Sequence, residues 1–432
     1  MSAAILAVLA VAVAFGDQRR ITVVLARPGG GEEAASTVRE VALTFDAEPA
    51  RARIEAALRV EPPVAGQIRW RGRTLAYVFA GPLEPGSYRF WLPAGEYGRG
   101  GERLEATFEM AFTVRAPGIA LVVAAGKQQE LVAVRPGAEP VVVAAAPRIV
   151  DYAVSPDGMQ VAVVVADTEG WGGLVLAPAD GGSARSLVQS PEMTIGGVAW
   201  SPDGSAMVVV RRDRLPSGEL GVPRTWLLRI GGEFAGEIDT GGSPSLNPAW
   251  SPDGQQLAYI SPSDARVVVT NLGTGETREV GQPRGGWPAW SPDSRLVAFE
   301  SALRTGSASP LQPVRVVSLD GALDRSFGEA GEVRSAPRLL DGETLLSLRR
   351  VYAEGRAATD LVFESIRDGS LLRAVQLVPG SAVVLHWDLD ATGDRVAFSV
   401  IVEGAPQVVI VDLVSGEREV LALAGERPKW LP

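Results

Sequence analysis

Short apolar stretches separated by turn residues run along most of the chain, and this pattern predicts a protein made almost wholly of β-strands. Two segments, Arg266–Thr270 and Gln407–Val411, alternate apolar and polar residues with the period of two that is typical of a strand with one buried face. The stretch Ala50–Leu58 is an exception, because there the pattern predicts one or two helical turns. The sequence therefore indicates the all-β class.

A turn motif recurs from about residue 141 to the end of the chain and divides this part into similar units. In four close copies, Val or Trp precedes Ser-Pro-Asp and then Gly or Ser; two degenerate copies and a final Trp complete the series. Successive copies lie 46, 50, 40, 48, 49 and 43 residues apart, which is the period of a four-stranded propeller blade. The residues that define the motif are Asp157, Trp200, Asp203, Trp250, Asp253, Trp290, Asp293, Trp387 and Trp430.

The residue types of the motif suit a tight turn that follows a strand. Proline presets φ, aspartate accepts hydrogen bonds from the backbone of its own turn, and glycine takes the strained last position. The Trp before the turn presents a large ring, which we expect to pack between neighbouring blades. Each repeated Asp thus has a structural role, and whole blades separate these carboxylates, which is too far for a catalytic pair.

The number of blades follows from the strands left over at the two ends of the repeat region. Three predicted strands, Ile119–Ala124, Leu131–Val134 and Pro140–Val143, precede the first motif, whereas Trp430 has no strands after it. If residues 427–431 supply the missing strand of that first unit, the ring closes and its sheets have no open edge at the seam. The sequence therefore predicts a seven-bladed β-propeller over residues 117–432.

Residues 21–116 lack the motif and form a separate region. They contain six or seven short predicted strands with Pro/Gly turns between them, which favours a β-sandwich. The tripeptide Ala116-Pro117-Gly118 is the expected boundary between this sandwich and the propeller.

Residues 1–20 open with an apolar run. Ala3–Gly16 spans fourteen residues, shorter than the ~20 that a membrane-spanning helix needs, and Ala14 and Gly16 are small residues suited to cleavage before Asp17. No basic segment precedes the run, so a membrane anchor, a longer anchor cut short and a buried strand stay as alternatives to a signal peptide. We expect an extracytoplasmic protein that is periplasmic, secreted or anchored facing outward.

The composition of the chain excludes several kinds of functional site and partner. The chain has no cysteine and a single histidine, His386, which excludes disulfides, thiolate nucleophiles and the usual Cys or His metal sites. The net charge of −10 argues against nucleic acid and against an anionic membrane surface as partners. The stretch Asp388–Asp394 is similar to the start of a calcium loop, but it coincides with the repeat turn, which we favour. We therefore predict no cofactor, no metal and no catalytic residues.

Two family resemblances follow from these residues. The Trp-Ser-Pro-Asp-Gly repeats resemble the TolB-type, WD40-like propeller repeats of bacterial periplasmic proteins, but the chain departs from the best-known member in blade number and in its first domain. Residues 21–115 resemble the bacterial Ig-like domains of S-layer and surface proteins, through Val41–Pro49, Leu83–Tyr88 and Phe108–Thr113. The first resemblance implies a protein-binding propeller, and the second implies a spacer without catalytic residues.

The favoured interpretation is a monomeric binding or scaffold module with a protein or cell-envelope partner. Loops carry binding on rigid scaffolds, and the predicted loops that lead into each blade's first strand hold Met193, Asn247, Trp287, Arg334, His386 and Arg427. We expect Trp287 and Arg334 to be the main contacts, since exposed Trp and Arg are frequent interface anchors; packing of Trp287 between blades is the alternative.

A second hypothesis is a carbohydrate-active or peptidase-related enzyme with its active site at the mouth of the channel. Such a site requires several charged side chains that converge on one point of the channel. The sequence has neither a Gly-x-Ser-x-Gly elbow nor a phosphate loop, which favours the binding hypothesis.

Overall fold

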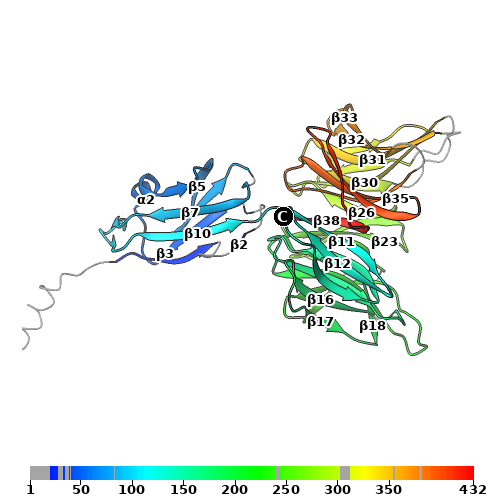
Figure 1. Ribbon diagram of the computed structural model, residues 1–432, viewed down its shortest axis with the longest axis horizontal. Coiled ribbons are helices and arrows are strands. Elements are labelled where there is room, and N and C mark those ends of the chain that lie inside the picture. The colour runs from blue at the N-terminus through cyan, green and yellow to red at the C-terminus, as the bar shows by residue number, and fades with distance from the viewer. Residues whose placement is uncertain are drawn as a thin grey trace, which may run out of the picture. The chain divides into compact units, whose positions relative to one another are not determined.

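The computed structural model describes residues 20–27, 33–34, 38, 40–81, 83–170, 172–238, 243–301, 312–353, 356–378 and 382–432. The chain divides into two compact units, residues 1–117 with Pro432 and residues 118–431. Strands supply nearly all the regular structure of both units (Figure 1), which confirms the all-β prediction. The expected signal or anchor segment lies outside the described residues except for Arg20. Among the described helices, none is long and apolar enough to cross a membrane.

Two four-stranded sheets form the first unit. Its elements are β1 (Val23–Arg27), β2 (Glu33–Ala34), β3 (Glu40–Phe45), α2 (Arg51–Ala57), β4 (Arg59–Glu61), β5 (Gly66–Arg71), β6 (Thr74–Phe79), β7 (Gly86–Leu92), β8 (Gly95–Glu96), β9 (Arg103–Leu104) and β10 (Phe108–Val114). One sheet has the order β1-β3-β6-β5, the other has the order β2-β10-β7-β4, and β8 pairs with β9. The residues of β3 are buried alternately, and Leu43 and Phe90 from the two sheets share one core. The Ig-like assignment stays a prediction.

Seven four-stranded antiparallel sheets form the second unit, and we number them as blades 1 to 7. The first strands are β38 (Glu426–Leu431), β14 (Arg148–Val154), β18 (Met193–Trp200), β22 (Leu246–Trp250), β26 (Pro283–Trp290), β30 (Glu332–Leu339) and β34 (Val384–Leu389). These strands contact one another from blade to blade, as β14 contacts β18 and β34 contacts β38. They therefore line the inside of the ring, and we call them the inner strands. The seven sheets confirm the predicted seven-bladed β-propeller.

The remaining strands complete each blade from the inside outward. Blade 1 has β11 (Gly118–Ala125), β12 (Gln128–Val134) and β13 (Val141–Ala146); blade 2 has β15 (Gln160–Ala166), β16 (Gly172–Pro178) and β17 (Arg185–Gln189); blade 3 has β19 (Ala206–Asp213), β20 (Arg224–Arg229) and β21 (Phe234–Glu237); blade 4 has β23 (Gln256–Ser261), β24 (Arg266–Asn271) and β25 (Thr277–Gly281). Blade 5 has β27 (Leu296–Ser301), β28 (Val314–Ser318) and β29 (Asp324–Phe327); blade 6 has β31 (Thr344–Ala353), β32 (Arg356–Ser365) and β33 (Leu371–Val378); blade 7 has β35 (Arg395–Val402), β36 (Ala405–Asp412) and β37 (Arg418–Val420).

The C-terminal strand closes the ring. Strand β38 pairs antiparallel with β11, so that Trp430 lies opposite Ile119 and Leu431 opposite Gly118 (Figure 1). It also forms hydrogen bonds with both neighbouring blades. The Arg427 guanidinium donates hydrogen bonds of 2.8 Å to the carbonyl oxygens of Ile149 and Val150 in β14. On the other side, the backbone N–H of Trp430 donates to Asp388 Oδ2 at 2.9 Å. The strand is thus held by blades 7, 1 and 2.

The Trp residues of the motif join consecutive blades. The indole N–H of Trp200 donates to the carbonyl of Ala153 at 3.0 Å, and the indole N–H of Trp290 donates to that of Ala249 at 3.0 Å. In both pairs the acceptor belongs to the inner strand of the preceding blade. The indole of Trp430 makes the same bond to Asp388, at 3.2 Å. Trp250 differs, because its buried indole N–H has no partner among the described residues.

The Ser-Pro-Asp-Gly segments form the turns that follow the inner strands. In blade 3, Asp203 Oδ1 accepts hydrogen bonds from the Ser201 hydroxyl at 2.7 Å and from the Ser205 backbone N–H at 3.0 Å. Gly204 takes φ +70°, in the left-handed region that favours glycine. Asp157, Asp253 and Asp293 accept the corresponding bonds in their own turns. Each motif aspartate is therefore bound to its own turn.

Blade 7 departs from the predicted alignment of the motif. Leu389 pairs with Val396 as Trp200 pairs with Met207, and the Asp390 N–H bonds the Arg395 carbonyl as the Ser201 N–H bonds that of Ala206. Leu389, and not Trp387, therefore takes the Trp position of the motif. The Trp387 assignment was wrong by two residues, because Asp390 occupies the serine position and caps the turn in its place.

The turn of blade 3 predicts how the stability of the protein depends on pH. Hydrogen bonds from the side chain of Ser201, and then from the backbone and side chain of Ser205, lower the pKa of Asp203 from its usual value of 3.8. A carboxyl group with a lowered pKa in the folded state stabilises that state above its ordinary pKa, and this contribution is lost as the pH falls through the lowered value. We expect Asp203→Asn to lower the melting temperature at pH 7 and to have a smaller effect near pH 3. An equal difference at both pH values would contradict the capping role.

Candidate functional site

The residues that we expected in loops lie instead on the inside of the ring. Met193, Asn247, Trp287, Arg334, His386 and Arg427 all lie within the inner strands. The loop assignment was wrong because each of these strands continues past a bulge, where its pairing register shifts, as between Ile195 and Gly197 or between Leu246 and Ala249. A bulge interrupts the alternation of side chains that marks a strand in the sequence.

The bulges create one equivalent position in every blade. It lies three residues before the Trp position of the motif. The residues at that Trp position are Val154, Trp200, Trp250, Trp290, Leu339, Leu389 and Trp430. Three of these positions have φ values of +52°, +48° and +54°, at Asn247, Ala336 and Arg427, which are uncommon for residues other than glycine. We call the full set the inner ring; it consists of Asp151, Gly197, Asn247, Trp287, Ala336, His386 and Arg427.

Most polar members of the inner ring bond the backbone of a neighbouring blade. Asn247 Nδ2 donates to the carbonyl of Gly286 in blade 5 at 2.6 Å. Asp151 Oδ2 accepts from the N–H of Val198 in blade 3 at 3.2 Å. Arg427 uses both terminal nitrogens on blade 2, as described above. Asn247 and Arg427, which we expected to contact a partner, are thus engaged in holding the blades together.

Trp287 extends across the inside of the ring. A Cβ atom placed on Gly197 would lie 3.4 Å from Cη2 of Trp287, so the indole of blade 5 reaches past blade 4 to the inner strand of blade 3. The missing side chain of Gly197 leaves room for this ring. Trp287 nevertheless keeps 39% of its surface exposed. It therefore packs against another blade and also keeps part of its aromatic surface exposed.

His386 is exposed on the inner strand of blade 7. The surrounding protein desolvates its imidazole and lowers its pKa below the usual 6.5, and the positive charge of Arg427 acts in the same direction. Both effects favour the neutral form of the imidazole. Among the described residues, no group of three or more His, Asp or Glu side chains is arranged to hold a metal ion.

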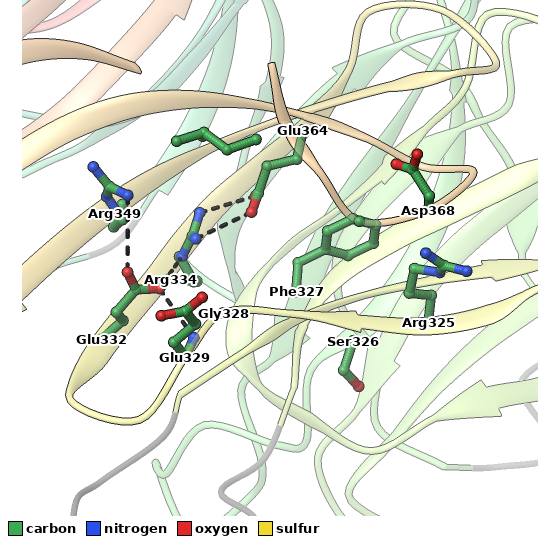
Figure 2. Close-up of a pocket in the computed structure, with 12 residues that line it drawn as sticks. Arg325, Ser326, Phe327, Gly328, Glu329, Glu332, Arg334, Arg349, Glu364 and Asp368 are labelled. Carbon is green, nitrogen blue, oxygen red and sulfur yellow. Dashed lines mark hydrogen bonds and ion pairs between the residues drawn. The ribbon is translucent and has the colours of Figure 1, made fainter. Parts of the chain in front are cut away.

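Arg334 is not an exposed contact. Only 3% of its side chain is accessible, and it lies between two carboxylates: its Nε donates to Glu332 at 2.9 Å, and its terminal nitrogens donate to Glu364 at 2.9 and 3.1 Å (Figure 2). The assignment of Arg334 to an exposed loop was wrong, because its side chain runs along the sheet of blade 6 toward Glu364. Burial raises the pKa of Glu364, and the charge of Arg334 partly opposes that shift.

A cavity of about 410 Å³ lies beside this ion pair, between blades 5 and 6. Blade 5 contributes Arg325 and Phe327 from β29 and the following Glu329, and blade 6 contributes the charged cluster and the turn at Asp368 (Figure 2). Arg349 completes the cluster through an ion pair of 2.7 Å with Asp360. The sequence analysis did not identify Glu332, Arg349 and Glu364 as residues of a site. The signal that could have identified them is a charged residue at a position that is apolar in other blades.

The closed ring of seven four-stranded sheets defines the class of this protein as a β-propeller. No family model matches the chain. The sequence is 39% identical to the Tol-Pal system protein TolB of Alcanivorax borkumensis over 61 residues, 13% of this chain and 14% of that protein. It is 50% identical to the Tol-Pal system protein TolB of Actinobacillus succinogenes over 44 residues, 10% of each. The propeller repeats are thus of the TolB type, and the matches span only a small part of those relatives.

Among solved structures, puromycin hydrolase aligns with 72% of this chain and 54% of its own at a TM-score of 0.50. The sequences are 16% identical over that alignment. At this identity the likeness shows the shared fold and carries no information about activity.

Proposed function

We propose that this protein is an extracytoplasmic binding module without enzymatic activity. Its propeller acts as a monomer and presents one end of the ring to a protein of the cell envelope. This end is the one at which the inner strands begin, and we call it the leading face. The short matches to TolB, whose name places it in the Tol-Pal system, support an envelope partner, and the apolar start of the sequence supports export.

The observation that carries this proposal is the apolar surface of the leading face. The hairpin that follows β19 exposes Leu215, Leu220 and Val222 by 42–50%. Blade 7 adds further exposed side chains at the start of β34 and at the end of β35, namely Val383, Leu385, Ile401 and Val402. Together with Trp287, these residues supply the aromatic and aliphatic contacts that protein interfaces use.

The polar residues of the inner ring favour binding over catalysis. A catalytic site needs charged groups that are free to converge on a reacting atom. Here Asp151 and Arg427 bond to backbone groups, and Lys429 Nζ bonds the Tyr152 carbonyl and lies 3.6 Å from Asp151. These bonds occupy the groups that an enzyme of the carbohydrate-active or peptidase-related kind would need, so the binding function is the one we propose.

Substitution of Trp287 tests the proposal. We expect Trp287→Ala to abolish capture of the envelope protein that the wild-type chain binds in cross-linked envelope fractions. Because the indole is partly exposed, its loss should cost less stability than the ~3–5 kcal/mol of a fully buried Trp. The matched control is Val414→Ser, which changes a residue 77% exposed in the turn between β36 and β37, at the opposite end of the blades.

Capture that survives Trp287→Ala but fails in Val414→Ser would contradict the leading face as the binding surface. Turnover of an envelope polymer that is lost on Asp151→Asn, with the ring still folded, would contradict the absence of enzymatic activity.

A further inference from the structure

The cavity between blades 5 and 6 interrupts the repeat of the propeller core. Arg334 pairs with Arg349 on the neighbouring strand, and the residues in the same register in three other blades are Ile149, Ile195 and Val384. Glu364 pairs with Leu345, and its counterparts in four other blades are Ala177, Leu228, Val317 and Val411. All seven counterparts are buried and apolar. Blade 6 thus replaces part of an apolar core with a buried Arg–Glu pair.

Stability alone does not account for this replacement. Desolvation of both charges offsets most of the attraction within a buried ion pair, and packed apolar residues of similar volume are often at least as stabilising. In the described part of the chain Arg334 is the only buried arginine, so the other blade interfaces described pack without such a pair. Departures from the local rules of a fold occur preferentially at functional sites, and here the departure coincides with a cavity large enough for a small ligand.

The charges at the inner end of the cavity are unbalanced. Three carboxylates line this end, Glu329, Glu332 and Glu364, against the two guanidinium groups of Arg334 and Arg349; the difference, three minus two, is one negative charge. At the other end, Arg325 lies beside Asp368 and the two charges offset each other (Figure 2).

Two carboxylates of the inner end are available to a ligand. The side chain of Glu329 makes no hydrogen bond or ion pair within the described part of the chain, and it lies on the exposed segment after β29. The Oε1 atom of Glu332 forms a long ion pair of 3.9 Å with Arg349 Nη1, beyond hydrogen-bond distance, so its capacity to accept hydrogen bonds is left for a ligand. Phe327 and Leu371 add apolar surface to the same cavity.

From this arrangement we propose that the cavity binds an organic cation, an ammonium or guanidinium group on an aliphatic chain. The cationic group would donate hydrogen bonds to Glu329 and Glu332 and balance the excess negative charge, and the chain would pack along Phe327 and Leu371. Either a free amine or a basic side chain of a peptide carries this chemistry. Glu332 begins β30 at the same end of the ring as the leading face, but the cavity uses none of the apolar residues named for that face, and the proposal does not depend on the function proposed there.

Calorimetric titration of the full chain with matched probes tests this proposal. Nα-acetyl-argininamide represents a peptide side chain, Nα-acetyl-citrullinamide is its uncharged counterpart, and putrescine represents a free amine. We expect at least one of the two cations to bind, at least about tenfold more tightly than the citrulline derivative. The stronger binder of the two identifies the source of the cation. The proposal would be overturned if neither cation binds more tightly than the citrulline derivative, or if neither binds at about 10 mM.

Variants locate the site. Glu329→Gln removes one charge from an exposed residue, so we expect it to fold and to weaken cation binding about tenfold. Glu276→Gln makes the same change at an exposed glutamate of a blade 4 turn and should leave binding unchanged. If both variants bind the cation as the wild-type chain does, the cation lies elsewhere and the assignment fails. Tighter binding of glutamate than of either cation would also overturn it, since the site would then be specific for anions.

Discussion

Deletion of residues 426–432 is expected to unfold the propeller at temperatures where the full chain is stable. The deletion removes the inner strand of blade 1 and leaves β11 with an unpaired edge. It also removes Trp430, which is 7% exposed, and the bonds from Arg427 to Ile149 and Val150. Loss of one buried Trp alone costs ~3–5 kcal/mol, so the total should exceed about 5 kcal/mol, which is comparable to the whole stability of many domains.

Thermal unfolding followed by circular dichroism measures this effect. Deletion of Pro432 alone is the matched control, because Pro432 lies beyond β38, and it should leave the melting temperature unchanged. An unaltered transition in the longer deletion would show that β38 does not hold the ring closed.

The second large effect is expected for Arg334→Met. This substitution keeps the volume of the side chain but leaves Glu332 and Glu364 buried without their cation. Removal of one partner from a buried ion pair destabilises a protein by ~3–5 kcal/mol, because the other charge stays desolvated. Chemical denaturation at pH 7 measures the loss, and a change below about 1 kcal/mol would contradict the buried arrangement.

Two further measurements separate the lost ion pair from other causes. The double variant Arg334→Ile and Glu364→Val restores the apolar residue types of blades 3 and 7 at these positions, and we expect it to be more stable than Arg334→Met. Burial already raises the pKa of Glu364 in the wild-type chain, and loss of Arg334 raises that pKa further. The deficit of Arg334→Met should therefore be largest at neutral pH and shrink as acid protonates Glu364.

The local features of the propeller could be read from the sequence because short-range chemistry determines them. The spacing of the Ser-Pro-Asp-Gly turns gives the length of a blade, and the turns form from residues that lie within five positions of one another, such as Ser201 and Ser205. The strand count before the first motif and after the last one gives seven blades. Neither inference needs information about residues distant in the sequence.

The candidate site could not be read in the same way. Trp387 was assigned to the motif from its residue type and its spacing, whereas the pairing of Leu389 with Val396 sets the true phase of blade 7. Arg334 was expected to be exposed because it was placed in a loop of the binding face, and its burial depends on Glu364, thirty positions away in the chain. Its partners lie on different strands, and no periodicity along one strand brings them together.

The sequence by itself determined the class of fold, the repeat and the turn chemistry, since these depend on residue type, spacing and local backbone preference. Only the tertiary structure decided that Trp287 crosses to Gly197 and that Arg427 secures the seam at β14. It also decided that a charged cavity separates blades 5 and 6. The physical reason is that bulges change the direction of side chains, and the closure of the ring then brings together groups whose contacts depend on the positions of whole blades.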